Sequence, residues 1–318
     1  MKQILIIILL LLSGCSTKHD IETKRVDKKT IQKTISSNKI KTQKSIKKNN
    51  MFTPQEYGLK GIKHIQNREY TKGRELLEKG CTLNDGISCY NLGVIYYNGK
   101  GIRVDKFKTV ELYQKACQLD NAWGCNNLGG MYREGEGVRA DKFKAVELYQ
   151  KACQLDGAKG CFNLGVMYET GKGVRVDKLK AVELYQKACQ LDNASGCSNL
   201  GVMYEKGKGV RVDKLKAVEL YQKSCQLDDA SGCYNLGGMY REGEGVRVDK
   251  FKAVELYQKA CQLDDAWGCH NLGLMYENGK GVRVDKFKAK EFFGKACDLK
   301  DENGCKNYKR LQDILNKK

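Results

Sequence analysis

One stretch of thirteen residues occurs six times in this chain, and its copies follow one another at a constant interval of 36 residues. The copy at Asp141 reads DKFKAVELYQKAC, and the others begin at Asp105, Asp177, Asp213, Asp249 and Asp285. A fixed period of this size is typical of solenoids, in which each unit packs only against its neighbours. The period therefore outweighs the length of 318 residues, which would otherwise indicate two or three globular domains.

Each unit is predicted to hold two helices, so the fold is expected to be all-α. The first helix has its apolar stripe at Ala145, Leu148, Tyr149, Ala152 and Cys153, and the second at Cys161, Leu164, Gly165 and Tyr168. We expect Asp141 to cap the first helix, and Gly171 and Gly173 to end the second. Gly165 is expected to allow the close approach of a neighbouring helix. Neither helix can bury its stripe alone, so stacked copies would form the core.

Fourteen cysteines fall into seven pairs, and the two members of each pair are eight residues apart. The pairs are Cys81 and Cys89, Cys117 and Cys125, Cys153 and Cys161, Cys189 and Cys197, Cys225 and Cys233, Cys261 and Cys269, and Cys297 and Cys305. A short helical hairpin places such positions within reach of a disulfide, and each bridge would stabilise the fold by about 2–3 kcal/mol. Pairs of this spacing, in a chain with three histidines, do not fit a zinc site. We expect no metal and no other cofactor.

Residues 1–14 are predicted to be a signal peptide, because one lysine precedes an apolar run that is too short to span a membrane stably. The sequence LSGC that ends at Cys15 resembles the lipobox of bacterial lipoproteins, which implies cleavage before Cys15 and lipidation of its sulfur. An ordinary signal peptide is the alternative. Ser16 follows where an aspartate would imply inner-membrane retention, so the outer membrane is slightly favoured by analogy.

The remaining chain divides into three parts. Residues 15–50 are predicted to be the lipidated cysteine and a basic, disordered tether, since eleven Lys and Arg and three Asp and Glu give residues 16–50 a net charge of +8. Residues 51–68 are predicted to form an N-terminal capping helix that begins with a capping box of Thr53 and Glu56. Residues 69–318 are predicted to hold seven cysteine-paired repeats of 36 residues, the last of which acts as the C-terminal cap.

The repeated elements KACxLDxAxGCxNLGxMYxxGxGV and DxxKAVELYQKAC resemble the Sel-like repeat (SLR) class of tetratricopeptide-related solenoids. The cysteine pairs and the period are similar to those of the Helicobacter cysteine-rich proteins, and this resemblance covers about residues 54–318. It implies a right-handed α/α solenoid of disulfide-bridged helical hairpins. It also implies penicillin binding or weak β-lactamase activity on penams and cephems, and interaction with the envelope or the host.

No known β-lactamase site is recognisable in the residues themselves. Neither S-D-N nor K-T-G occurs, and S-x-x-K occurs only at Ser36–Lys39 and Ser45–Lys48 in the predicted tether. The histidines are too few for a zinc enzyme, and cysteines held in disulfides leave no thiolate nucleophile. The sequence therefore leaves open whether the chain is an enzyme, and any catalytic residues are unknown.

Positions that vary between near-identical units are candidates for ligand contact. They comprise the residue after the second cysteine of a pair and the residue two before it, which gives Tyr90, Asn126, Phe162, Ser198, Tyr234, His270, Trp123 and Trp267 as candidate binding residues. In tetratricopeptide-like solenoids such side chains line a groove, and aromatic rows suit extended peptides. Neutral drift on an outer face is the alternative, and His270 taken alone is expected to be a surface histidine.

We therefore expect an exported, lipid-anchored repeat protein that binds a peptide or a protein of the envelope or host in a concave groove. The alternative is a penicillin-binding protein or β-lactamase. The net charge of +19 is not taken as a sign of nucleic-acid binding, because no nucleic-acid-binding module is recognisable. The expected protein is a monomer, held on the periplasmic or surface face of a bacterial envelope by its lipid alone, or secreted.

Overall fold

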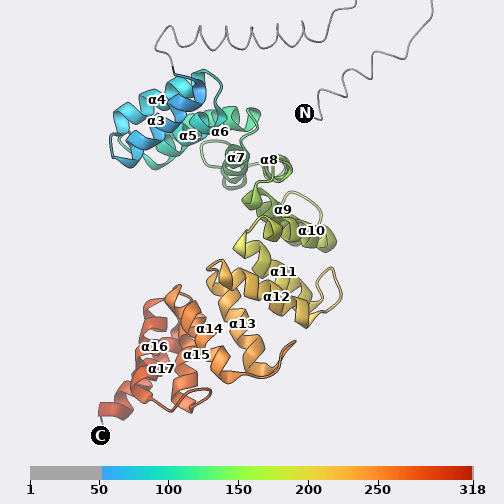
Figure 1. Ribbon diagram of the computed structural model, residues 1–318, viewed down its shortest axis with the longest axis vertical. Coiled ribbons are helices and arrows are strands. Elements are labelled where there is room, and N and C mark those ends of the chain that lie inside the picture. Colours follow the sequence, from blue (N-terminus) through green and yellow to red (C-terminus); the bar gives the residue numbers. More distant parts are fainter. Residues whose placement is uncertain (1–51, 317–318) are drawn as a thin grey trace, which may run out of the picture. The chain divides into compact units, whose positions relative to one another are not determined.

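The computed structural model describes residues 52–316, and every regular element in this part of the chain is a helix (Figure 1). The helices are α3 Pro54–Gln66, α4 Tyr70–Thr82, α5 Gly86–Asn98, α6 Lys106–Gln118, α7 Ala122–Glu134, α8 Lys142–Gln154, α9 Ala158–Thr170, α10 Lys178–Gln190, α11 Ala194–Lys206, α12 Lys214–Gln226, α13 Ala230–Glu242, α14 Lys250–Gln262, α15 Ala266–Asn278, α16 Lys286–Asp298 and α17 Glu302–Asn316. The predicted signal peptide, Cys15 and the tether lie outside the described residues. The all-α prediction is confirmed.

Neighbouring helices in the chain are also neighbours in space, as a solenoid requires. Each helix packs against the one before it and the one after it, and odd-numbered helices also touch one another, as α5 touches α7 and α11 touches α13. The core is a series of small clusters that bridge adjacent units. In one cluster, Tyr113 of α6 and Leu128 of α7 pack with Leu148 of α8. The predicted stacking of apolar stripes is therefore confirmed.

The predicted helix ends are also present. Thr53 and Glu56 form the capping box, in which Glu56 accepts from the Thr53 backbone N–H at 2.7 Å and Thr53 Oγ1 accepts from the Glu56 N–H at 3.2 Å. Asp141 caps α8 by accepting from the Lys144 N–H at 3.0 Å. Gly171 ends α9 in the left-handed region with φ of 70°. These contacts satisfy backbone groups that the first and last turns leave free.

Gly165 shows why a glycine recurs inside the odd-numbered helices. A Cβ built there would lie 2.8 Å from two ring carbons of Tyr185, which is fully buried on α10. The glycine therefore lets the tyrosine ring press against the backbone of α9, and the packing advantage offsets its poor helix propensity. The expected close approach is confirmed.

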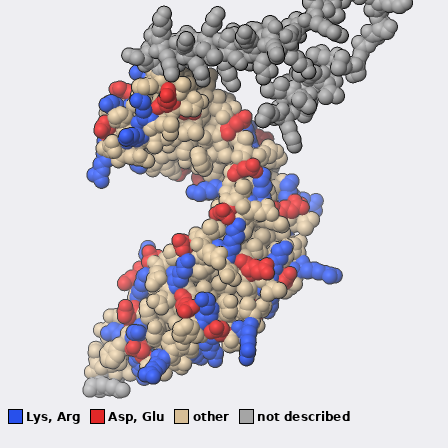
Figure 2. All heavy atoms as spheres, in the orientation of Figure 1, with Lys and Arg blue, Asp and Glu red and all other residues tan. Residues whose placement is uncertain are grey.

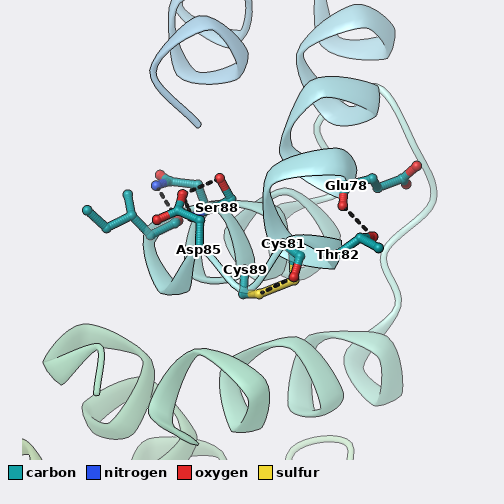
Figure 3. Close-up of a disulfide and its surroundings, with 8 residues drawn as sticks. Glu78, Cys81, Thr82, Asp85, Ser88 and Cys89 are labelled. Carbon is teal, nitrogen blue, oxygen red and sulfur yellow. Dashed lines mark hydrogen bonds between the residues drawn. A yellow bond between two sulfur atoms is a disulfide. The ribbon is translucent and has the colours of Figure 1, made fainter. Parts of the chain in front are cut away.

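All seven predicted cysteine pairs form disulfides, with Cα atoms 4.5–4.6 Å apart. Figure 3 shows Cys81 at the end of α4 bonded to Cys89 in the first turn of α5. The two helices are joined by three residues, of which Asn84 is left-handed with φ of 64°. Asp takes this place in the next five connections, in keeping with the tolerance of short polar side chains for this conformation.

A ladder of lysine contacts joins successive even-numbered helices. Lys187 of α10 donates to the Cys153 carbonyl at 2.9 Å and pairs with Asp156 at 2.9 Å. The same lysine–aspartate pair recurs as Lys151–Asp120, Lys223–Asp192, Lys259–Asp228 and Lys295–Asp264. Figure 2 shows both charge signs interspersed on the visible face. Part of the repeat charge is therefore structural, because Lys187, Lys223, Lys259 and Lys295 also satisfy a carbonyl at a helix end.

Candidate functional site

A cleft of about 470 Å³ opens between α5 and α7 and reaches the first turns of α9. Two predicted binding residues, Tyr90 and Asn126, line it. The rings of Tyr90 and Tyr113 stack with centroids 5.8 Å apart, and the ring of the predicted Trp123 also lies 5.8 Å from that of Tyr90. Burial raises the pKa of Tyr113 to about 12, so its hydroxyl stays protonated at neutral pH. One wall of the cleft is therefore aromatic, with hydroxyl groups available as donors.

A row of asparagines passes through this cleft and continues along the odd-numbered helices. We call it the Asn row, and its members are Asn91, Asn127, Asn163, Asn199, Asn235, Asn271 and Asn307. All are half-buried. Asn163 donates to Asn126 at 2.8 Å, and Asn127 bonds the hydroxyl of Tyr113. Most other members of the row also make a hydrogen bond within the fold. Each amide offers two donor hydrogens and an acceptor oxygen with two lone pairs, so every member keeps capacity for a ligand.

A charged residue lies three turns into each of α7, α9, α11 and α13, and its sign divides these units into two kinds. In α9 and α11 the residue is a glutamate, and it is satisfied within the fold: Tyr185 donates to Glu169 at 2.7 Å and Tyr221 to Glu205 at 2.6 Å. Burial, and then the hydrogen bond to the carboxylate, raise the pKa of both tyrosines. These units present no unpaired hydroxyl at this position.

In α7 and α13 the same position holds Arg133 or Arg241, and a glycine stands three residues before it. A Cβ at Gly130 would meet only the Tyr149 hydroxyl, at 3.8 Å, so the fold has room for a side chain there. Arg133 Nε donates to Glu134 at 2.6 Å, which leaves its Nη groups without a hydrogen bond among the described residues. The absent side chain thus opens a space beside a guanidinium and a tyrosine hydroxyl.

We call the units with Arg133 and Arg241 the arginine units. The second of them lines a smaller cleft of about 300 Å³ between α13 and α15. Arg241 donates to Glu242 at 2.6 Å and to Asn271 of the Asn row at 3.1 Å. Lys250 and Lys280 also line this cleft, against the single carboxylate of Glu242. Three cations and one anion make it suitable for an anionic group.

The other predicted binding residues do not all face a cleft. Phe162 packs 5.9 Å from Tyr185 and Tyr234 packs 5.9 Å from Tyr257, so both extend the aromatic packing of the next even-numbered helix. Ser198 is 4% exposed and belongs to the core. Trp267 is 56% exposed. The predicted binding residues thus lie partly in a cleft, partly in the interior and partly on the exposed surface.

His270 differs from the surface histidine that its residue type alone predicts. Its side chain is 12% exposed, its ring lies edge-on to Phe293 at 5.5 Å, and Nδ1 is 2.5 Å from Asp301 Oδ2. Asp301 also caps α17 by accepting from the Gly304 N–H at 2.8 Å. His270 therefore links α15 to the last helix, which is a structural role.

The variable positions do not reveal two features of the site, the Asn row and the pairing of an arginine with a glycine. The Asn row stands two residues after the second cysteine in every unit, and a polar residue kept on an amphipathic helix was a usable signal. The sequence GGMYREGEG occurs twice, at Gly129–Gly137 and Gly237–Gly245, and pairs each arginine with its glycine. Within the described residues, no cluster of side chains could hold a metal, and no helix is long and apolar enough to cross a membrane.

The chain resembles known proteins both in sequence and in structure. The Sel1 repeat profile matches seven times, at residues 55–85, 86–121, 124–157, 158–193, 194–229, 230–265 and 268–301. A stretch of 42 residues is 41% identical to "Putative beta-lactamase HcpC" of Helicobacter pylori, and it spans 13% of this chain and 14% of that protein's length.

Two solved structures share the fold. The Sel1 repeat protein of Oxalobacter formigenes aligns with a TM-score of 0.72 and 26% identity, over 76% of this chain and 99% of that one. Escherichia coli c5321, a protective antigen of uropathogenic strains with an SLR fold, aligns with a TM-score of 0.72 and 26% identity, over 91% of this chain and 60% of that one.

Proposed function

The chain belongs to the Sel1 repeat family, and from this premise we propose that it is an exported, lipid-anchored binding protein. Its ligand is an extended peptide segment of a partner in the cell envelope or on a host cell. The segment lies in a groove along the Asn row. Repeat proteins of this kind act as scaffolds, since stacked units present an extended surface.

The observation that carries the proposal is the cleft between α5 and α7, where Asn127 and Asn163 lie beside the rings of Tyr90 and Tyr113. A side-chain amide hydrogen-bonds a peptide group whatever the peptide's sequence, and tyrosine rings are rigid anchors for side chains. Because the amide recurs in every unit, successive units offer equivalent groups to an extended chain.

The two arginine units add selectivity for acidic side chains. Arg133 and Tyr149 border the space that Gly130 leaves open, and Arg241 borders the second cleft with Lys250 and Lys280. Guanidinium and tyrosine hydroxyl groups together suit a carboxylate. The preferred peptide therefore carries acidic residues, at positions set by the separation of three repeats between α7 and α13.

Export is supported by the seven disulfides, which are typical of proteins outside the cytoplasm. Lipidation at Cys15 belongs to the proposal on the strength of its LSGC motif. Metabolic labelling with palmitate tests this anchor, because the parent chain should take up the label and a Cys15→Ser chain should not. Equal labelling of the two chains would contradict the anchor.

The geometry favours binding over β-lactam hydrolysis, which the name of the Helicobacter relative suggests. Ser88 donates to Asp85, Ser195 to Asp229 and Ser224 to the Ala194 carbonyl. None of these hydroxyls donates to a lysine or histidine that could take its proton. Sustained opening of a simple penam by the purified oxidised protein, absent from a mock preparation, would support the enzyme instead.

A peptide library tests the proposed function. Displayed peptides selected on the oxidised protein are titrated against Asn127→Ala/Asn163→Ala and against Lys159→Ala, which changes an exposed side chain of α9 outside the cleft. We expect the double variant to bind about tenfold or more weakly, since each lost hydrogen bond is worth about 1 kcal/mol, and the lysine variant to bind normally. Equal affinity of all three proteins would contradict the groove.

A further inference from the structure

An exposed stripe of apolar and basic side chains runs along the edge where the even-numbered helices begin. It consists of six segments, 103–108, 139–144, 175–180, 211–216, 247–252 and 283–288, which we call the edge segments. Each reads Arg, Val or Ala, Asp, Lys, Phe or Leu, Lys. The aromatic or leucine residues are Phe107, Phe143, Leu179, Leu215, Phe251 and Phe287, and all are between 59% and 75% exposed.

These side chains do not serve the core of the described fold. The core of each unit begins two residues later in the even-numbered helix, as Ala145 does in α8 after Phe143. Where valine precedes the helix, it is exposed as well: Val104, Val176, Val212, Val248 and Val284 are 48–60% exposed. Exposed large apolar groups at one position of six successive units mark an interaction surface.

The edge segments form a continuous row rather than six separate patches. The loop that leads into each segment lies directly on the first turn of the preceding one, so a Cβ at Gly137 would come within 2.5 Å of the Lys106 carbonyl oxygen. Lys106 also pairs with Glu136 of that loop at 2.9 Å. Glycine at the equivalent position approaches Lys142, Lys178, Lys214 and Lys250 in the same way. Each segment therefore packs against the loop that leads into the next segment, which makes the row continuous.

Much of the net positive charge of the chain lies in this row. The six segments hold eighteen Lys and Arg and six Asp, a net charge of +12 out of the chain's +19. Their aspartates serve as helix caps although they are largely exposed, as when Asp105 accepts from the Lys108 N–H at 2.8 Å. Their six arginines make no ion pair among the described residues. Five of their twelve lysines pair with glutamates outside the segments, and the edge remains cationic after these pairs are counted.

We propose that this edge docks on a membrane surface that contains anionic lipids. Phenylalanine and leucine enter the boundary between headgroups and acyl chains, while the flanking lysines and arginines meet lipid phosphates. The lysine stems can lie along the apolar boundary with their ammonium groups in water. This surface is separate from the Asn row except at Lys250, which also lines the cleft between α13 and α15.

The test uses residues 16–318, which lack the predicted signal peptide and Cys15, so that neither the apolar run of residues 1–14 nor acylation plays a part. Binding is measured by co-sedimentation with vesicles of phosphatidylglycerol and phosphatidylethanolamine, and with vesicles of phosphatidylcholine alone. A variant with Phe107→Ser, Phe143→Ser, Phe251→Ser and Phe287→Ser keeps every charge of the edge and of residues 16–50. Trp123→Ser/Trp267→Ser removes two exposed aromatics elsewhere and serves as the matched control.

We expect the anionic vesicles to bind the chain about tenfold or more tightly than the neutral ones, and the four-phenylalanine variant to lose about tenfold or more of that affinity. The tryptophan control and Asn127→Ala/Asn163→Ala should bind like the parent chain. In a further variant, Phe143→Trp should shift its emission to the blue when anionic vesicles are added. The proposal is overturned if the parent chain ignores anionic vesicles, or if the four-phenylalanine variant binds undiminished. A chain that binds an acidic protein but neither kind of vesicle overturns it equally.

Discussion

The hydroxyl of Tyr185 donates a hydrogen bond of 2.7 Å to Oε2 of Glu169, and this contact separates two kinds of repeat in one solenoid. In α9 and α11, where glutamate is present, the hydroxyl of the facing tyrosine is occupied within the fold. Where Arg133 or Arg241 replaces it, the equivalent tyrosine makes no such bond to a carboxylate of the preceding helix. The fold is thus the same in both kinds of unit, and the difference lies in what is left for a ligand.

Paired tyrosine substitutions test this distinction. Tyr185→Phe removes a partly buried bond to a carboxylate and should lower the free energy of unfolding by about 1–2 kcal/mol. Tyr149→Phe, in an arginine unit, should change it by less than about 0.5 kcal/mol while weakening the binding of acidic peptides. Urea denaturation of both variants measures the difference. Equal losses of stability would show that the two hydroxyls are equally engaged.

The free energy of unfolding should fall as the pH rises above 10, before the buried tyrosines of the folded protein ionise. Burial raises the pKa of Tyr113 and Tyr257 from 10.0 to about 12. A raised tyrosine pKa contributes stability that is fully present below pH 10 and is lost as the pH rises towards 12, because the unfolded chain ionises first. Brief urea titrations at successive pH values should show this decline, and Tyr257→Phe should make it shallower. A stability that is level up to pH 12 would contradict the buried tyrosines.

Removal of one central disulfide should be costly although six remain. Replacement of Cys153 and Cys161 by alanine frees an eight-residue connection, and the chain-entropy estimate gives a loss of about 2–3 kcal/mol. The measurement is urea unfolding of the oxidised variant beside the oxidised parent chain. A loss below about 1 kcal/mol would mean that helix packing alone fixes the hairpin.

Asp265 is the N-cap residue of α15, and a substitution there should change the free energy of unfolding in a pH-dependent way. Burial raises the pKa of Asp265 above its ordinary value of 3.8, so the fold disfavours the carboxylate. That penalty is absent in acid and appears as the pH rises through the folded pKa. Asp265→Asn, which installs the residue found at Asn121 and Asn193, should raise the free energy of unfolding at pH 7 by about 0.5 kcal/mol. The gain should vanish near pH 3, and a gain equal at both pH values would contradict the assignment.

Periodicity predicted the helices, their caps and the disulfides, because each depends on local spacing. Gly165 is a clear case, since only a close neighbour explains a glycine inside an apolar stripe, and the ring of Tyr185 is that neighbour. Variability alone could not separate Tyr90, which lines a cleft, from Ser198, which is buried. The two share a repeat position, and their surroundings differ through residues on other helices. The exposure of Phe107 could not be predicted, because this residue lies outside the apolar stripe of its helix. Whether such a side chain is covered depends on how the loops and helices of other units pack.

Site-specific photo-crosslinking tests the central claim most directly. Benzoylphenylalanine replaces Val94 or Val166 beside the Asn row, or the exposed Glu147 of α8 as a control, and each protein is irradiated with an acidic peptide selected on the parent chain. The groove predicts crosslinks at positions 94 and 166, loss of both in the Asn127→Ala/Asn163→Ala background, and none at 147. Crosslinks at 147 alone, or equally at all three positions, would place the peptide elsewhere and contradict a binding groove along the Asn row.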